Sequence, residues 1–440
     1  MKLCLIGKLP PVKGGVARLA YQTVIALAAA GVEVHVVTNA NEVEPCHRHL
    51  MLPEDHGVMA EALTGVHVHQ TQTVFEPRSF HIPLSPAYET KLLSLAMDVI
   101  EEHDCDAVMG WYFQPYGVVA ALAGQLLGKP VIAMHAGSDI GFLPDHPQLG
   151  RAYRRMIAQT DAIITGNSDP VLGRLGALGA TERQLRFPEP GFNRLLPEFS
   201  KPLPFDVADY VPHLAEHYRP YATPHGPLAL ELIDDIVELS SKPLDADAPT
   251  IGVYGKAGTV KGTVELYEAL ERLGQRGRRF NFVQLACGRF PILDGLYRQL
   301  LSRPALAARS WVLPTVAPWR IPGYLDRCDI TCFLENRFGI AFHTPNVPRE
   351  ILARGSCFVC SGEVANSGLW STALDDGDSV VVVDDPRNID DLAERIDGVL
   401  EDRERRQQIG EFGRFISEQI EPHATENHVA NLIRKIIEEQ

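Results

Sequence analysis

One short pattern occurs twice in this chain, at residues 7–14 and again at residues 255–262. The first copy reads Gly-Lys-Leu-Pro-Pro-Val-Lys-Gly and the second reads Gly-Lys-Ala-Gly-Thr-Val-Lys-Gly. Each copy follows an apolar run typical of a buried strand and precedes a helix-like segment. A strand, a glycine-rich turn and a helix form the unit with which α/β proteins commonly bind anions. Two such units predict two similar domains that face each other.

Strand and helix patterns alternate on both sides of an irregular middle segment. Such alternation predicts α/β domains with doubly wound parallel sheets, whose ligands lie at the carboxyl ends of the strands. The middle segment, residues 188–249, is rich in proline, aromatic and acidic residues. Within it we expect helices near Val207–Tyr218 and Leu228–Ser240. The expected division is an N-terminal Rossmann-like domain (1–194), a linker or insertion (195–248), a C-terminal Rossmann-like domain (249–416) and a terminal amphipathic helix (417–440).

The apolar runs give the expected strands of both domains. In the first domain they are Leu3–Ile6, Val32–Thr38, Val66–Gln72, Ala107–Gly110, Val131–His135 and Ala162–Gly166. In the second they are Thr250–Gly255, Asn281–Gly288, Ser310–Pro314, Ile330–Leu334, Cys357–Ser361 and Ser379–Val383.

Charge and composition exclude several classes of protein. The 440 residues carry a net charge of −15 and 45% hydrophobic residues, which suits a globular protein and disfavours nucleic-acid binding. The eight cysteines lie mostly in strand-like runs and are expected to be buried free thiols. No secretory leader or membrane-spanning run is apparent. The expected location is therefore the cytoplasm, with peripheral membrane contact left open.

The second copy of the pattern holds the candidate anion site. Gly255 leaves the backbone unobstructed, and Lys256 and Lys261 supply positive charge, which is what a diphosphate requires. The loop matches neither a Walker loop nor the Gly-x-Gly-x-x-Gly fingerprint, so a dinucleotide-dependent oxidoreductase is disfavoured. A solvated surface turn would show the same composition.

Two further residues each allow two interpretations. Glu350 falls in the first turn of an expected helix, Pro348–Arg354, where a carboxylate either caps the helix or accepts two ribose hydroxyls. His135 ends an expected strand just before Gly137. It can serve a substrate in a cleft or act as a structural histidine bonded to a neighbouring carbonyl.

Histidines also gather between the second and third expected strands. Cys46, His47, His49 and His56 fall in an expected loop, with His67 and His69 nearby. Their spacing matches no zinc motif. His67 and His69 stand two apart on a strand, which indicates one exposed face. No metal site is therefore expected.

Several stretches occur in an order and spacing that resemble one known family. They are Gly14-Gly15-Val16, Asp106–Asp139 with its His-Ala-Gly-Ser-Asp ending, Gly166-Asn167-Ser168, Pro190–Asn193, the second lysine loop, Ile321–Glu335 and Glu350–Glu363. The family is that of the retaining GT-B glycosyltransferases, family GT4 (glycosyl transferases group 1). The resemblance covers most of the chain apart from about residues 195–247. It implies two Rossmann-like domains around a central cleft and a C-terminal helix that returns to the first domain.

The resemblance also implies roles for individual residues. The diphosphate of the donor would be held by Lys256 and Lys261 beside Gly255, the donor ribose by Glu350, and the donor sugar would lie near His135. From the other side of the cleft Gly14 and Gly15 would approach the donor, and Val316 belongs to the same donor-binding set.

This sequence departs from the family pattern in two places. Lys256 replaces an arginine, which keeps the charge but loses a bidentate fork. The first glutamate of the family's Glu-x7-Glu pair is replaced by Phe342. Either His343 or Glu335 would then contact the donor sugar as a catalytic group, with His343 preferred.

The implied activity is transfer of a hexosyl group from a nucleotide-diphosphate sugar to an acceptor hydroxyl. The transfer would retain the anomeric configuration and need neither a metal nor a cofactor. The expected partners are the nucleotide sugar and a glycan, lipid-linked or small-molecule acceptor. Two alternatives remain open, namely a degenerate, non-enzymatic nucleotide-sugar-binding protein and a nucleotide-sugar epimerase on the same fold.

Overall fold

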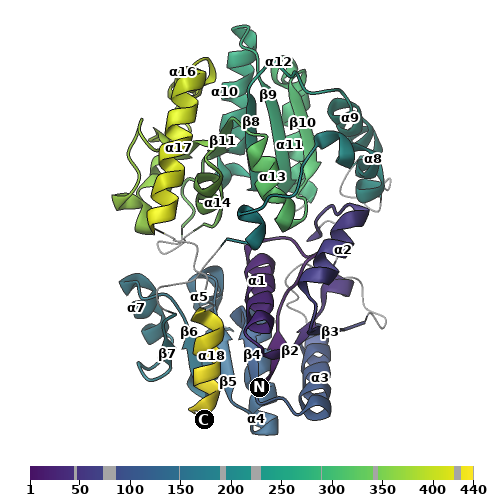
Figure 1. Cartoon of the computed structure of the whole chain (residues 1–440), viewed down its shortest axis with the longest axis vertical. Helices are drawn as coiled ribbons and strands as arrows, with labels where there is room; N and C mark the ends of the chain where they lie inside the picture. The colour runs from purple at the N-terminus through teal and green to yellow at the C-terminus, as the bar shows by residue number, and fades with distance from the viewer. Residues whose placement is uncertain are drawn as a thin grey trace.

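The computed structural model describes residues 1–43, 47–72, 86–147, 149–188, 195–219, 229–288, 290–339, 345–420 and 428–439. Two parallel sheets form the centres of two domains, one above the other in Figure 1. The carboxyl ends of both sheets carry the loops with the repeated pattern, so these loops lie between the domains.

The first domain has a seven-stranded sheet in the order β3-β2-β1-β4-β5-β6-β7, and every neighbouring pair is parallel. All five residues of the central strand β4 are buried, as expected for a strand covered on both faces. The strands are β1 (Lys2–Ile6), β2 (Glu33–Thr38), β3 (Val66–Gln70), β4 (Ala107–Trp111), β5 (Val131–Met134), β6 (Ala162–Ile164) and β7 (Leu185–Arg186).

The second domain has a six-stranded parallel sheet in the order β10-β9-β8-β11-β12-β13. This is the 3-2-1-4-5-6 order of a Rossmann fold. The strands are β8 (Thr250–Lys256), β9 (Asn281–Cys287), β10 (Ser310–Pro314), β11 (Ile330–Phe333), β12 (Cys357–Ser361) and β13 (Val381–Val383).

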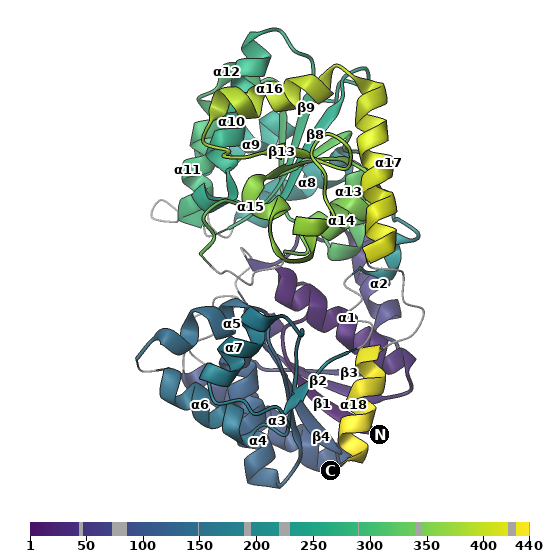
Figure 2. The ribbon, with the colours of Figure 1, turned by 90° about the vertical axis from the view of Figure 1, so that its left-hand side faces the viewer.

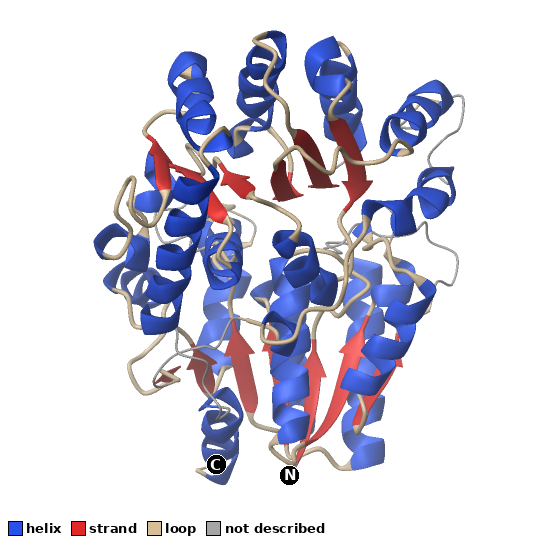
Figure 3. Cartoon of the chain, turned by 45° about the horizontal axis from the view of Figure 1, so that its top comes forward, coloured by secondary structure: helices blue, strands red, loops and turns tan. Residues whose placement is uncertain are grey.

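Helices cover the sheets of both domains (Figure 3). The first domain contains α1 (Gly15–Ala29), α2 (Pro53–Ala62), α3 (Pro86–His103), α4 (Val118–Leu127), α5 (Ser138–Gly141), α6 (Gly150–Gln159) and α7 (Asp169–Ala177). The later helices are α8 (Val207–Tyr218), α9 (Leu230–Ser240), α10 (Thr263–Gln275), α11 (Phe290–Leu301), α12 (Pro304–Ala307), α13 (Ile321–Asp326), α14 (Val347–Arg354), α15 (Gly362–Ala365), α16 (Ile389–Leu400), α17 (Arg403–Ile420) and α18 (His428–Glu438). None of the described helices has both the length and the apolar character needed to span a bilayer.

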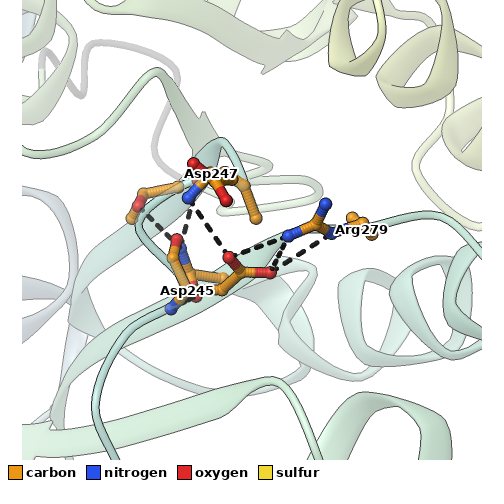
Figure 4. Close-up of polar contacts among 6 residues, drawn as sticks. Asp245, Asp247 and Arg279 are labelled. Carbon is orange, nitrogen blue, oxygen red and sulfur yellow. Dashed lines mark hydrogen bonds and ion pairs between the residues drawn. The ribbon is translucent and has the colours of Figure 1, made fainter.

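The described helices of the middle segment, α8 and α9, pack against β10 of the second domain. Helix α8 begins at an Asp206 cap, and α9 ends at Ser240, whose hydroxyl accepts from the Val312 N–H at 3.0 Å. The next turn is tied by Asp245 and Arg279, whose side chains pair at 2.7 Å just before β8 and β9 (Figure 4). This exposed pair contributes little stability, but it lies where the chain passes from the middle segment into β8.

The C-terminal part of the chain returns to the first domain. Helix α17 lies along the second domain, whereas α18 packs beside α1 near the N-terminus (Figures 1 and 2). Ala430, Ile433 and Ile436 form the buried face of α18, and Arg434 donates to the Ala30 carbonyl. The expected return of a C-terminal helix is confirmed.

A segment of the first domain also docks on the second. The Leu50 N–H donates to the Thr315 carbonyl at 2.9 Å. Asp55 of α2 is fully buried and accepts from Trp319 Nε1 at 2.9 Å and Arg320 Nε at 2.7 Å. A buried carboxylate needs such partners, so this contact fixes α2 against the second domain.

The two-domain architecture agrees with the sequence analysis, and several elements differ from it. His56 lies in α2 rather than in a loop, the last strand begins at Val381, and β7, α7 and α17 were not expected. Helix α17 runs across the boundary expected at residue 416. The described cysteines are free and, except for the half-buried Cys287, buried, as expected.

Candidate active site at the domain cleft

The strand order determines where the two lysine loops lie. In each sheet the order in which successive strands are added reverses beside the first strand, between β1 and β4 and between β8 and β11. Crevices form at such switch points, outside the carboxyl ends of the strands. Residues 7–14 follow β1 and residues 257–262 follow β8, so both copies of the pattern occupy the switch point of their sheet.

The loop after β8 depends on its glycines. Gly255 has φ +104° and Gly262 has φ +64°, values that residues with a side chain rarely adopt. Gly262 also lies against the loop after β11, because an added Cβ would come within 2.6 Å of Leu334 Cβ. Gly262 is the N-cap of α10 and offers no capping side chain, and a helix N-terminus without a side-chain cap can receive an anion.

A pocket opens beneath this loop at the ends of β8, β9 and β11. It contains roughly 300 Å³ of space not filled by atoms, part of it open to solvent. Its lining includes Lys256, Lys261, Thr263 and Tyr254. Two lysines, a hydroxyl and a glycine-rich backbone thus surround one small space, as a phosphate site requires.

Lys261 reaches across the switch point to Glu335, with which it forms an ion pair. The amino group also lies 4.2 Å from the centre of the Phe338 ring. Burial lowers the pKa of Lys261, whereas the charge of Glu335 raises it in part. In the structure, Glu335 therefore balances the charge of the lysine that the sequence analysis assigns to the diphosphate.

Lys256 and Lys8 bring positive charge to the cleft from opposite domains. Lys256 is exposed and makes no ion pair with any residue that the structure describes. Lys8 is only 3% exposed. Burial first, and then repulsion from Lys256, lower the pKa of Lys8 to about 7. The two copies of the pattern thus face each other through their first lysines.

Glu350 makes contacts in both domains. One carboxylate oxygen accepts from the Tyr254 hydroxyl at 2.5 Å, and the other pairs with Arg18 of α1 at 2.7 Å. Both Glu350 and Arg18 are buried. The position in the first turn of α14 fits the helix-cap interpretation electrostatically, but the two side-chain partners show that the carboxylate also joins the domains.

His135 lies at the end of β5 in a turn that Asp139 holds. The Asp139 carboxylate accepts the N–H groups of Ala136 at 3.0 Å, Gly137 at 2.9 Å and Phe113 at 3.0 Å. His135 Nε2 lies 2.7 Å from the Thr165 hydroxyl. The His-Ala-Gly-Ser-Asp motif therefore forms a rigid turn that presents a half-buried histidine.

The remaining predicted residues have different positions. Gly15 lies against the second domain, because a Cβ there would be 3.6 Å from the Asn346 amide, and Gly14 precedes it with φ +114°. Val316 is fully buried and bridges to Leu50, so its part in donor binding stays a prediction. His343 and the Pro190–Asn193 stretch lie outside the described residues.

Sequence reasoning assigned no role to several residues of this cleft. Lys8 stood in the first copy of the pattern but without a function. Arg18 gave no signal, and Tyr254 and Asp139 had no role assigned, because only the fold brings Arg18 and Tyr254 to Glu350 and the Asp139 carboxylate to three N–H groups.

Comparisons with known proteins agree with this geometry. A family model described as Glycosyltransferase Family 4 matches residues 13–187, and one described as Glycosyl transferases group 1 matches residues 237–415. Among curated proteins, none matches the chain in sequence.

Solved structures of similar fold cover the whole chain. HepE from Anabaena, solved with UDP and glucose, is 16% identical with a TM-score of 0.59, each chain being covered in full. Sucrose-phosphate synthase from Thermosynechococcus elongatus is 14% identical with a TM-score of 0.65, again with full coverage of both chains. A Listeria monocytogenes protein described as a candidate UDP-N-acetylglucosamine 2-epimerase is 11% identical with a TM-score of 0.53, covering 100% of this chain and 97% of its own.

The two family models account for both domains, and the lysine loop and Glu350 fall within the second of them. The structural similarities, all at low identity, add the arrangement of the domains. The chain therefore belongs to the GT4-type glycosyltransferases of the GT-B fold.

Proposed function

We propose that this glycosyltransferase moves a hexosyl group from a nucleotide-diphosphate sugar to an acceptor hydroxyl, with retention of configuration and without a metal. The observation that carries the proposal is the presence of two lysines, Lys256 and Lys261, in the lining of the pocket after β8, with Lys8 of the first domain close enough to Lys256 to be repelled by it. The chain has a net charge of −15, yet Lys256 repels both Lys8 and Lys261 here, so positive charge is concentrated at this site as an anion would require. HepE, of similar fold, binds UDP-glucose, which supports a nucleotide sugar as donor.

The leaving group explains why the lysines are needed. Departure of a nucleoside diphosphate leaves negative charge on the phosphates, and preorganised cations and N–H groups stabilise such charge most where water is excluded. Lys256, Lys261 and the N-terminal end of α10 would supply this stabilisation, in place of a divalent cation. The transfer would take place on one face of the sugar, near His135.

Glu350 would bind the donor ribose. Its carboxylate already has its partners Tyr254 and Arg18 in place, and two ribose hydroxyls could share these oxygens or displace the arginine. Because Arg18 belongs to the first domain, donor binding at Glu350 would then be linked to the contact between the domains.

Glu335 would change its interaction partner when the donor binds. In the structure it pairs with Lys261. A diphosphate would compete for that lysine, and Glu335 would then be free to turn toward the donor sugar. This gives Glu335 a place in the site, beside the proposed contact from His343.

A two-step experiment tests the proposal. Thermal shift with a panel of UDP-, GDP- and ADP-sugars first identifies the donor, since a ligand that binds the folded state raises Tm by mass action. Turnover of that donor over an acceptor panel is then compared between wild type, Lys261→Ala and the control Lys129→Ala, whose lysine pairs with Asp104 on the surface. We expect Lys261→Ala to lower kcat/KM by at least about 10²-fold and Lys129→Ala to leave it unchanged.

Other outcomes would select another function. Near-wild-type turnover in Lys261→Ala would contradict the assigned diphosphate site. Donor binding without turnover over any acceptor would indicate a nucleotide-sugar-binding protein, and conversion of the donor without an acceptor would indicate an epimerase. Glu335→Gln distinguishes the two roles of Glu335. If Glu335 only balances the charge of Lys261, the variant should bind nucleotide more tightly and keep its turnover. If Glu335 contacts the donor sugar, the variant should have reduced turnover.

A further inference from the structure

Four histidines from three elements meet on the first domain, outside the cleft. His35 is on β2, His67 and His69 are on the edge strand β3, and His103 is the last residue of α3. In the parallel register His35 stands opposite His67. Figure 1 shows β3 and α3 together at one side of the domain, whereas the cleft lysines follow β1 and β8.

The ring nitrogens are close enough to share one ion. One ligand atom each from His35, His69 and His103 falls in a group within 4.8 Å of one another. His35 Nδ1 and His69 Nε2 are 3.2 Å apart. Two nitrogens bound to one tetrahedral Zn²⁺ at about 2.0–2.1 Å lie roughly 3.3 Å from each other. That pair is therefore already at coordination distance, and His103 needs only a small side-chain movement.

Glu33 contacts the ring of His35. Its Oε1 lies 3.1 Å from His35 Nε2, whereas the other ring nitrogen, Nδ1, is the one near His69. A carboxylate that accepts from one ring nitrogen fixes the tautomer and leaves the lone pair of the other nitrogen for a metal. His35 itself is 1% exposed, so its orientation is fixed by packing as well.

The histidine rings also stack on one another. The ring of His35 stacks on His103 at 4.1 Å and on His67 at 4.7 Å, and such rings would repel one another if protonated.

We propose that His35, His69 and His103 bind a divalent transition metal ion of borderline softness, Zn²⁺ in the first instance, with Glu33 orienting His35. Three imidazoles with an open fourth position suit Zn²⁺, Co²⁺, Ni²⁺ or Cu²⁺, and do not suit Mg²⁺, which prefers oxygen. The ion would join β2, β3 and α3 at the edge of the sheet. The site is separate from the proposed sugar transfer and does not depend on it.

Calorimetric titration of the untagged, chelator-treated full-length protein with Zn²⁺ tests the site. We expect one equivalent to bind, with a rise in Tm, and no binding of Mg²⁺. His69→Gln and His103→Gln should each weaken Zn²⁺ binding by more than about 100-fold, and Glu33→Gln by about 10–100-fold. The matched control is His56→Gln, because His56 is an exposed histidine of the same domain, and it should bind Zn²⁺ as wild type does.

Co²⁺ gives a second measurement that needs no variant. Co²⁺ in a site of low coordination number absorbs visible light strongly, whereas octahedral Co²⁺ does not, so wild type should develop this absorption and lose it when Zn²⁺ is added. Absence of a stoichiometric Zn²⁺ site in wild type would overturn the proposal. Unchanged affinity in folded His69→Gln and His103→Gln would overturn it too, as would equal loss in His56→Gln.

Discussion

At the scale of one residue, Lys8 is a buried amine whose positive charge lowers the stability of the folded protein. Its amine is buried, it lies 5.5 Å from the centre of the Tyr112 ring, and its pKa is lowered to about 7. An unfolded lysine has a pKa near 10.4. Between these two values the unfolded chain binds more protons than the folded one, so this group makes stability rise with pH across that window. Below pH 7 the folded protein bears the full cost of the buried ammonium.

Replacing the charged group should therefore stabilise the fold. We expect Lys8→Met to raise the free energy of unfolding by about 1–3 kcal/mol near pH 6, because an apolar side chain of similar length removes the buried charge. The gain should shrink as the pH rises from 7 toward 10, because the folded wild-type amine is then neutral and the unfolded amine begins to lose its proton near pH 10. Urea denaturation at both pH values measures it. An equal gain at the two pH values would show that packing, rather than charge, is the cause.

Only some of these residues could be predicted from the sequence. Lys256 and Lys261 stand in a repeated local pattern, so the sequence indicated them directly. Lys8 shares that pattern, but its burial is a result of the fold that the pattern does not show. Glu350 was a candidate on position alone, whereas Arg18 lies more than 300 residues away along the chain and no local pattern connects them. Of the histidines of the proposed metal site, only His69 was considered from the sequence, and it was set aside on its spacing, because β2, β3 and α3 each supply part of the set.

At the scale of the element, the turn into α10 is set by contact with another loop. Gly262 lies 2.6 Å, measured from an added Cβ, from Leu334 Cβ and 2.8 Å from the Leu334 carbonyl oxygen. Glu335 comes next in the chain, and Lys261 precedes the glycine. A side chain at residue 262 would therefore move apart the two loops that carry the Lys261–Glu335 pair.

Gly262→Ala tests this contact against a matched variant. Gly277, just beyond the same helix, has φ +81° and nothing within 4 Å of an added Cβ, so Gly277→Ala measures the backbone cost alone. We expect that variant to lose about 1 kcal/mol and Gly262→Ala to lose about 2–4 kcal/mol, together with nucleotide affinity. Thermal unfolding and nucleotide titration give both quantities. Equal losses in the two variants would contradict the role given to Leu334.

Most strands could be predicted to within one or two residues, because buried parallel strands are short apolar runs between glycines and polar turns. The elements that were missed lack such a pattern. Strand β7 has two residues, and α2 shows no apolar stripe in Pro-Glu-Asp-His-Gly-Val-Met-Ala-Glu-Ala. Helix α2 is instead held by the buried Asp55–Arg320 contact with the second domain, which no local sequence reveals.

At the scale of the whole molecule, α18 attaches the end of the described chain to the first domain. Ile433 is fully buried on the face of α18 that packs beside α1. We expect Ile433→Ala to lower the free energy of unfolding of the first domain by about 2–4 kcal/mol, through lost burial and the cavity left behind. Lys435→Ala, with its lysine 73% exposed on the same helix, should change stability by less than about 0.5 kcal/mol. Scanning calorimetry measures both variants, and a loss in Ile433→Ala no larger than that of the control would show that α18 is not firmly docked.

The return of α18 also sets an order of assembly during synthesis. The ribosome makes β1 first and α18 only after the complete second domain, so the second domain can finish folding while the first still lacks a covering helix. Until then the surface of α1 that later meets Ile433 and Arg434 is exposed to water and to other chains. Maturation of the first domain is thus timed by the translation of residues that lie more than 400 positions from its start.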